Sequence, residues 1–257
     1  MKAPLTRAAR IRSGVIAVVT LLVAYEAMAR TSDAFSYAFV PLEQLLGALV
    51  EISRSGELLD NIAASLKVVL QGVAFGGGAG LLIGAAMAYS KPIAAFVNPL
   101  FNAWRPIPTL GLIPLIGLWF GNGDTAKLVL VCLAAAEPMI LNTYEGLRGT
   151  DQRYIEGGRA LTFSRSQLFW FVQLPAAMPS IFTGVQHALG FAWIATIGAE
   201  LLFTVGPGLG GVMERAQIAT RMDIVIVSVA AIGVVGLAIN TTVTRVSAHL
   251  LRWRDSQ

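Results

Sequence analysis

Six long apolar stretches dominate the sequence and constrain the fold more than any other feature. They cover roughly residues 13–29, 64–89, 96–120, 126–147, 181–204 and 224–250. The hydrocarbon core of a bilayer is about 30 Å thick and requires about 20 apolar residues per helix. Only 13% of the residues are charged and the mean hydropathy is +0.67, which excludes water as the main solvent. We predict an all-α membrane protein with six transmembrane helices and a single domain over residues 1–257.

The first stretch allows two interpretations. It is the shortest, and it follows a basic segment that contains Lys2, Arg7, Arg10 and Arg12. It ends in Ala27-Met28-Ala29, which is typical of a signal-peptide cleavage site. Glu26 directly before these residues is unfavourable for cleavage, so we favour a retained helix. Amino-terminal sequencing distinguishes the two.

The positive charges predict how the chain is oriented in the membrane. The net charge is +4, but Lys and Arg lie beside the apolar stretches and form no basic stripe, which argues against nucleic-acid binding. With the amino terminus inside, the cytoplasmic cations are Lys2, Arg7, Arg10, Arg12, Lys91, Arg148, Arg153, Arg159, Arg165, Arg245, Arg252 and Arg254. The outer cations are Arg30, Arg54, Lys127, Arg215 and Arg221. We therefore expect both termini in the cytoplasm, one long cytoplasmic loop over residues 150–179, and an amphipathic outer helix starting at Pro41 that rests at the interface.

Two spans carry unusual residues. In the second, Gly72, Gly76, Gly80 and Gly84 recur every four residues, and Gly77 and Gly78 add to a groove that allows close backbone approach. This row serves either ordinary packing within the bundle or a dimer seam. The third span contains Pro99, Pro106, Pro108 and Pro114, which remove backbone donors and predict a broken helix near a translocation pathway.

Several catalytic and nucleotide-binding motifs are missing from the sequence. It contains no phosphate loop to hold ATP, since no Lys is followed by Ser or Thr. Residues 206–211 satisfy Gly-x-Gly-x-x-Gly, but they follow a membrane helix and not a strand, which argues against a dinucleotide site. His187 and His249 form no zinc motif, and Cys132 stands alone. We predict no metal and no cofactor in this chain, and we find no residue set for a membrane-embedded enzyme.

The long cytoplasmic loop carries the most specific pattern. Residues 154–164 predict a short amphipathic helix and a break, followed by a second helix that Leu174-Pro175 closes. The spacing resembles the EAA signature of bacterial ABC-importer permeases, which forms the coupling helix that docks on the ATPase. Departures from it are Gly157 and Gly158 for two Ala, Val172 for Ile, and Thr162 for a Gly. Glycine permits a positive φ at that position and Thr does not do so freely, so the turn is expected to be strained. The residues that the resemblance assigns to coupling are Glu156, Gly157, Gly158, Arg159, Ala160, Leu161, Thr162, Ser164 and Pro175. The alternative is an incidental amphipathic loop.

Further segments extend the resemblance from about residue 40 to the carboxyl terminus. Residues 104–108, 113–115, 118–121, 190–194, 199–202 and 206–211 are similar to permeases of the nitrate, taurine and alkanesulfonate group. This resemblance implies the type I ABC-importer fold, alternating access, and a bacterial inner membrane. It also implies three kinds of partner: an ATPase dimer that carries ATP and Mg²⁺, an extracytoplasmic substrate-binding protein, and a second copy of this chain or a homologue. The alternative is a stand-alone secondary transporter or channel. The cargo stays open, since a fold does not name it.

Charged residues at membrane depth are the candidates for the translocation pathway. They are Arg105, Glu137, His187 and Glu200. A central charge costs about 2.5 kcal/mol or more on insertion scales, so such residues are functional candidates. Glu137 precedes Pro138 and is the distinctive one of the four, because the related permeases usually carry an apolar residue there. We expect it either to pair with Arg105 or His187, or to recognise a cationic, zwitterionic or hydrogen-bonding solute.

Overall fold

A computed structural model describes residues 7–31, 39–203 and 206–251. Every regular element in these ranges is helical. The α-helices are α1 (Arg7–Thr31), α3 (Leu42–Arg54), α4 (Glu57–Gly72), α5 (Gly78–Tyr89), α6 (Lys91–Trp104), α7 (Ile113–Phe120), α8 (Asp124–Arg148), α9 (Gln152–Ala160), α10 (Arg165–Leu168), α11 (Leu174–Leu202), α12 (Leu209–Ile218) and α13 (Met222–Leu250). Two π-helical turns, η1 (Val73–Gly77) and η3 (Phe169–Gln173), and one 3₁₀ turn, η2 (Thr109–Leu112), join some of them.

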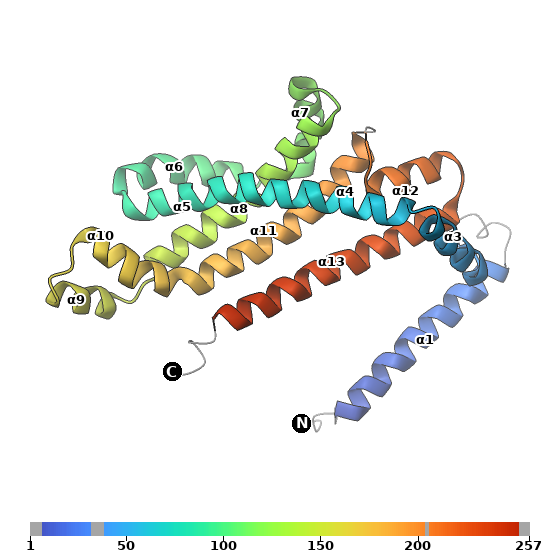
Figure 1. Cartoon of the computed structure of the whole chain (residues 1–257), viewed down its shortest axis with the longest axis horizontal. Coiled ribbons are helices and arrows are strands. Elements are labelled where there is room, and N and C mark those ends of the chain that lie inside the picture. Colours follow the sequence, from blue (N-terminus) through green and yellow to red (C-terminus); the bar gives the residue numbers. More distant parts are fainter. Residues whose placement is uncertain (1–6, 32–38, 204–205, 252–257) are drawn as a thin grey trace.

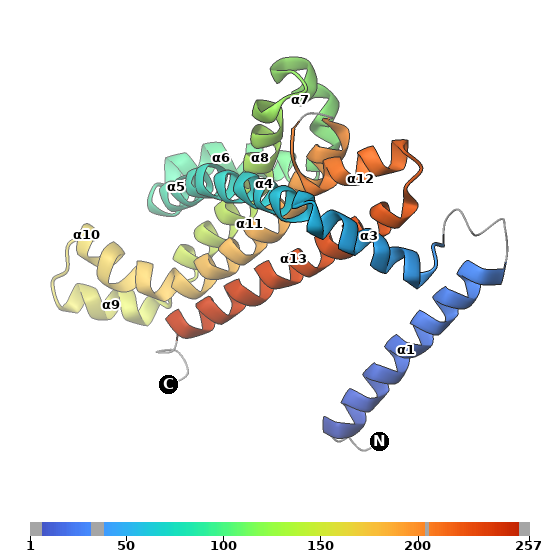
Figure 2. The ribbon, with the colours of Figure 1, turned by 45° about the vertical axis from the view of Figure 1, so that its right-hand side comes forward.

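The long helices run along the molecule with two short helices at each end, while α6 lies beside α5 and α7 projects from the middle of the bundle (Figures 1 and 2). Helices α4–α5, α8, α11 and α13 extend along the molecule, α9 and α10 lie at one end, and α3 and α12 lie at the other (Figures 1 and 2). Helix α1 stands apart from this bundle in both views. The two ends thus define two opposite faces for a protein that crosses a membrane.

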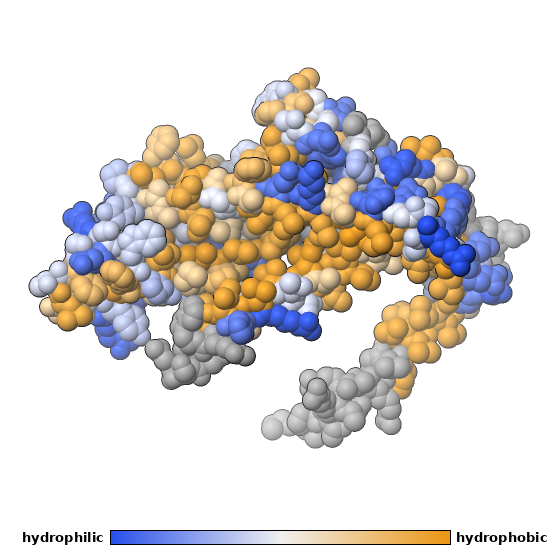
Figure 3. Space-filling view, in the orientation of Figure 1, coloured by the Kyte–Doolittle hydropathy of each residue, from blue (hydrophilic) through white to orange (hydrophobic). Residues whose placement is uncertain are grey.

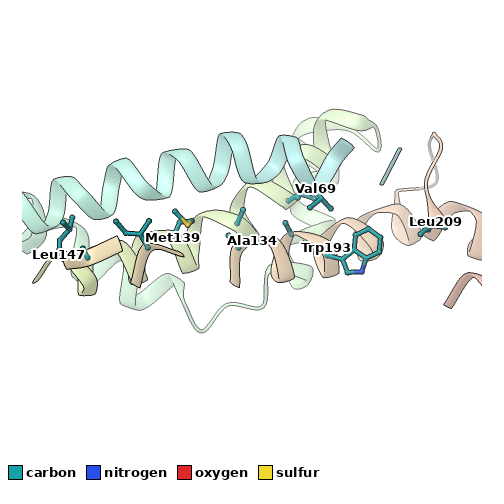
Figure 4. Packing of buried hydrophobic residues seen from close by; sticks show 13 residues of the cluster. Val69, Ala134, Met139, Leu147, Trp193 and Leu209 are labelled. Carbon is teal, nitrogen blue, oxygen red and sulfur yellow. The ribbon is translucent and has the colours of Figure 1, made fainter. Parts of the chain in front are cut away.

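The apolar core follows the contact between α8, α11 and α4–α5. Val69, Ala134, Met139 and Trp193 are among its buried residues, and Figure 4 shows them strung along this contact. Many core residues are alanines, so the helices approach closely. This agrees with membrane bundles, where small residues allow tight packing because lipid offers no hydrophobic drive between helices.

The surface carries an apolar belt between two more polar ends (Figure 3). Within the described residues, three helical segments are long and apolar enough to cross a membrane: Glu57–Tyr89, Arg165–Leu202 and Met222–Leu250. The other three predicted stretches also fall on helices, namely α1, α6 to α7, and α8. Helix α8 contains both acidic and basic residues, which lowers its hydropathy. The number of six spans therefore stays a prediction.

The glycine row of the second stretch packs on α8 of the same chain. A Cβ added at Gly80 would lie 2.6 Å from the carbonyl oxygen of Ala136, and one at Gly84 would lie 2.6 Å from that of Ile140. At Gly76 it would meet the backbone of Cys132. The row therefore serves packing within the bundle. Gly78 takes no part in the groove, contrary to our prediction, because nothing lies within 4 Å of its Cβ position.

The third stretch is broken, as its prolines predict. Helix α6 ends at Trp104, and the segment with Pro106 and Pro108 is not α-helical before α7 begins at Ile113. Pro99 lies inside α6 and Pro114 lies in the first turn of α7, where no backbone donor is needed, so neither breaks a helix. Only the middle two prolines interrupt the chain.

The predicted amphipathic outer helix is α3, and it packs on protein with one face. Ala48 and Ile52 are 2% exposed and contact Val227 of α13. The Arg221 guanidinium before α13 donates to a carboxylate oxygen of Glu51 at 2.7 Å. Leu46 and Val50 remain exposed. Its position at a membrane interface stays a prediction.

Candidate functional site

The predicted coupling loop folds as two short helices around a sharp turn. Asp151 caps α9 by accepting a hydrogen bond from the Arg153 amide at 2.9 Å, and the Arg153 guanidinium beside it lowers the pKa of the Asp151 carboxyl. Ser164 and Gln167 form a reciprocal capping box at the start of α10. Inside the turn, Gly158 is buried, and a Cβ there would lie 2.6 Å from Leu168 Cδ2. The local sequence therefore specifies this hairpin at both helix starts.

The turn has a positive φ at Thr162, as expected from the glycine that the EAA signature has at this position. Thr162 has a φ of 60°, in the left-handed region, and is one of two non-glycine residues with positive φ in the described chain. A β-branched side chain in this region crowds the backbone. The expectation of a strained turn is confirmed.

Thr162→Gly is expected to stabilise the hairpin by about 1 kcal/mol, because glycine adopts a positive φ without steric cost. The measurement is hydrogen exchange of the α9 amides in the purified chain, which should slow down. Thr162→Ala is the matched control, since it keeps the Cβ and therefore most of the strain. Equal exchange rates in the glycine and alanine variants would contradict a backbone origin of the effect.

The predicted end of the second helix at Leu174-Pro175 is wrong. Helix α10 continues through the π-helical turn η3 directly into α11, with Pro175 in the first turn of α11. The wider turn interrupts the regular ladder of hydrogen bonds just before the proline, so its missing N–H does not end the helix. The hairpin is thus continuous with the helical segment Arg165–Leu202, which is long and apolar enough to cross a membrane.

One surface of the hairpin is unusually exposed. Tyr154 is 59% exposed and Leu161 is 69% exposed, although both are large and apolar. The other assigned coupling residues that are exposed are Glu156, Gly157, Arg159, Ala160, Thr162, Ser164 and Pro175. Apolar side chains between charged ones at the tip of a rigid hairpin are typical of a protein-docking surface.

Two of the four predicted pathway residues lie together. Arg105 follows the last residue of α6 and Glu137 lies near the middle of α8, with Arg105 Nε 3.7 Å from Glu137 Oε1. Both line a cavity of about 390 Å³. Pairing with Arg105, one of the two partners we considered for Glu137, is what the structure shows.

His187 lies apart from this pair. It is exposed, and its ring stacks on Phe191 with the ring centroids 6.5 Å apart. Phe191 in turn lines the cavity, whereas His187 does not. The alternative pairing of Glu137 with His187 is therefore not what the geometry supports.

Glu200 is buried in a different part of the bundle and holds a glycine-rich loop. Its carboxylate accepts hydrogen bonds from Ser65 Oγ at 2.8 Å and from the Gly210 amide at 3.0 Å. Ser65 Oγ accepts from the Leu209 amide at 3.0 Å. Glu200 is 3% exposed. This closed network favours a structural role for Glu200 over contact with a solute.

The same contacts account for the Gly-x-Gly-x-x-Gly pattern. The Gly208 amide donates to Asn61 Oδ1 at 2.6 Å, and a Cβ on Gly208 would collide with the Glu200 carboxylate. Gly208 also has a φ of 158°. The loop turns its amides toward side chains of the protein itself, so the glycines permit close approach of an internal carboxylate and not of a dinucleotide.

Lys67 is a charged residue near the start of the second apolar stretch that sequence reasoning missed. It lies within α4 and lines a second cavity, of about 360 Å³, together with Gln71, Asp124 and Lys127. Lys127, one of the predicted outer cations, lies in the first turn of α8 and is 2% exposed, with its Nζ 2.8 Å from Asp124 Oδ1. The signal that could have identified Lys67 from the sequence is that it is the single Lys inside the apolar stretch 64–89.

In the described residues, the helical bundle with its apolar belt (Figure 3) and its several segments long enough to cross a membrane defines the class as a polytopic membrane protein. A family profile described as the binding-protein-dependent transport system inner membrane component matches residues 76–255. A permease protein SsuC of Bacillus subtilis (strain 168), whose name refers to aliphatic sulfonates, is 34% identical over 206 residues, or 80% of this chain and 74% of that protein. The taurine transport system permease protein TauC of Escherichia coli (strain K12) is 30% identical over 97% of this chain and 92% of its own length.

A solved structure shares the fold. The methionine ABC transporter MetNI in an inward-facing conformation aligns with a TM-score of 0.63 and 19% identity, covering 77% of this chain and 97% of that one. The chain belongs to the family of binding-protein-dependent transport system inner membrane components. It is a multi-pass permease subunit of an ABC importer in the inner membrane and not an enzyme, with the ATPase on a separate chain. The alternative of a stand-alone secondary transporter or channel is thereby set aside.

Proposed function

We propose that two copies of this chain form the pathway for a small solute, and that each copy transmits ATPase motion through the hairpin of α9 and α10. An extracytoplasmic binding protein delivers the solute, and an ATPase dimer binds ATP and Mg²⁺. The observation that carries the proposal is the exposed hairpin with EAA spacing, continuous with α11. Movement of a docked partner would therefore act directly on a helix of the core.

The orientation we propose follows from the same hairpin. If α9 and α10 meet the ATPase, their end of the bundle faces the cytoplasm. Helix α13 runs from the α3–α12 end toward this end, and α1 runs in the opposite direction, toward α3 (Figure 1). Both termini then belong to the cytoplasmic side, as the distribution of Lys and Arg predicts. Lys2, Arg252 and Arg254 of that set lie outside the described residues.

Glu156→Lys is expected to uncouple transport while the membrane fold stays intact. Glu156 is exposed on α9, and reversing its charge opposes whatever cationic groups it meets on the ATPase. We expect at least about a tenfold loss of ATPase co-purification and of transport-stimulated hydrolysis in reconstituted vesicles, which corresponds to about 1.4 kcal/mol.

The matched control for this experiment is Glu214→Lys. Glu214 lies on α12 at the opposite end of the bundle, so the same change of charge should leave both readouts unchanged. Thermal unfolding of both variants checks the fold. Unchanged co-purification and hydrolysis in Glu156→Lys would remove the coupling assignment.

A further inference from the structure

The cavity that Arg105 and Glu137 share presents both signs of charge at membrane depth. Arg105 reaches it because Pro106 and Pro108 end the helix there and turn the chain. Glu137 reaches it from α8, near the middle of that 25-residue helix. Two elements distant in sequence thus place opposite charges in one hollow.

The ion pair between Arg105 and Glu137 leaves hydrogen-bonding capacity on both side chains unused. Their closest approach is 3.7 Å, which is an ion pair without a short hydrogen bond. The Arg105 side chain is 42% exposed and that of Glu137 is 25% exposed. A guanidinium carries five N–H donors and a carboxylate has about four acceptor sites, so both groups keep capacity for a ligand. The Arg105 guanidinium also lies over the Phe101 ring, 5.8 Å from its centroid, which orients it.

The rest of the cavity wall is mostly apolar. Ile107, Leu110, Ala134, Phe191 and Ile194 contribute to it, and the volume is about 390 Å³. Pockets of about 300 to 1,000 Å³ with apolar walls and a few convergent polar groups are typical of small-molecule sites. A small solute with a short aliphatic chain between two charged groups would fit this lining.

We propose that this cavity is a recognition site for small zwitterionic organic solutes, with Arg105 binding the anionic group and Glu137 the ammonium group. The inference rests on the proposed transport function and names its cargo class. A simple anion would meet Arg105 but also the repulsion of Glu137, and a simple cation would meet the converse. A zwitterion replaces one ion pair by two, so the charges of Arg105 and Glu137 both stay compensated when it enters.

A neighbouring cavity, which also borders Arg105, supports this assignment because its wall too carries both acidic and basic side chains. It measures about 350 Å³, lies between α6 and α8, and is lined by Arg105, Asn102, Glu145 and Arg148 among others. Tyr144 stands on its wall and its hydroxyl accepts from Arg148 Nη1 at 2.7 Å. Arg105 borders both cavities. A solute released from Glu137 could therefore contact the acidic, basic and amide side chains that line the neighbouring cavity.

The test is direct binding to the purified full chain, measured by saturation-transfer NMR at millimolar solute. The probes are 2-aminoethanesulfonate and ethanesulfonate, which differ only in the ammonium group. We expect the wild type to favour the aminated probe by about tenfold. Glu137→Gln should lose about that factor for the aminated probe only, and Arg105→Gln should weaken both probes. The control Glu214→Gln, outside both cavities, should change neither.

Equal binding of the two probes by the wild type would overturn the proposal, and so would an unchanged preference in Glu137→Gln. Absence of binding at millimolar solute would also overturn it. If a single variant unfolds, the double variant Arg105→Glu with Glu137→Arg replaces it, because it keeps the pair neutral. The double variant should retain the preference for the aminated probe. The proposed coupling function is read separately by ATPase co-purification, so its failure is distinguishable from failure of the site.

Discussion

Gly80→Leu is expected to destabilise the chain strongly. The side chain would enter the contact between α5 and α8, where even a Cβ would lie 2.6 Å from the Ala136 carbonyl oxygen and 2.8 Å from Met139 Cβ. Backbone cannot move aside as a side-chain end can, so the helices must separate. Overpacking of a core costs about 1 to 3 kcal/mol and occasionally more, and we expect the upper end here.

The matched control is Gly78→Leu, two residues earlier in the same helix but outside the glycine row. Nothing lies within 4 Å of its Cβ position, and replacing a helical glycine gains up to about 1 kcal/mol of helix propensity. The measurement is thermal unfolding in detergent together with the amount of monodisperse protein recovered. If Gly80→Leu were as stable as Gly78→Leu, the packing of the glycine row on α8 would be wrong.

Glu200→Ala is expected to release the glycine-rich loop from the bundle and to destabilise the chain by about 3 to 5 kcal/mol. The substitution removes the acceptor of Ser65 Oγ and of the Gly210 amide, and buried groups left without partners carry their full desolvation cost. The loop joins α11 to α12, so its loss should also loosen the end of the bundle that carries α3 and α12. Hydrogen exchange of the α12 amides and thermal unfolding measure the two effects.

A surface glutamate at the same end provides the control. The Glu57 side chain is 44% exposed and forms an ion pair with Arg215 at 3.3 Å, so Glu57→Ala should cost no more than about 1 kcal/mol. Glu200→Gln keeps the shape and one acceptor, and it should fall between the two. A Glu200→Ala protein as stable as Glu57→Ala would contradict the structural role and return Glu200 to the pathway candidates.

Local features of the fold could be read from the sequence because they depend on neighbouring residues. The break at Pro106 and Pro108 follows from missing donors, and the positive φ of Thr162 follows from its place in a two-helix motif. The continuation of the helix past Pro175 was missed, because a π-helical turn depends on the packing of both flanking helices and has no local signature.

The candidate site was predicted only as a set of separate residues. Sequence reasoning named Arg105, Glu137, His187 and Glu200 as charges at membrane depth but left open which of them meet. The structure joins the first two, leaves His187 stacked on Phe191, and assigns Glu200 to a buried network. Lys67 was overlooked because a lone lysine within an apolar stretch lowers the hydropathy only slightly.

The sequence by itself determined the membrane environment, the helical class and the helical hairpin at residues 152–168, since each depends on hydropathy, backbone donors or capping residues along a short piece of chain. Only the tertiary structure decided that the glycine row packs on α8, that Ser65 meets Glu200 across 135 positions, and that Arg105 meets Glu137 in one cavity. The reason is physical. Lipid is as apolar as the bundle core, so hydropathy places a helix in the membrane but does not say which of its faces touches another helix.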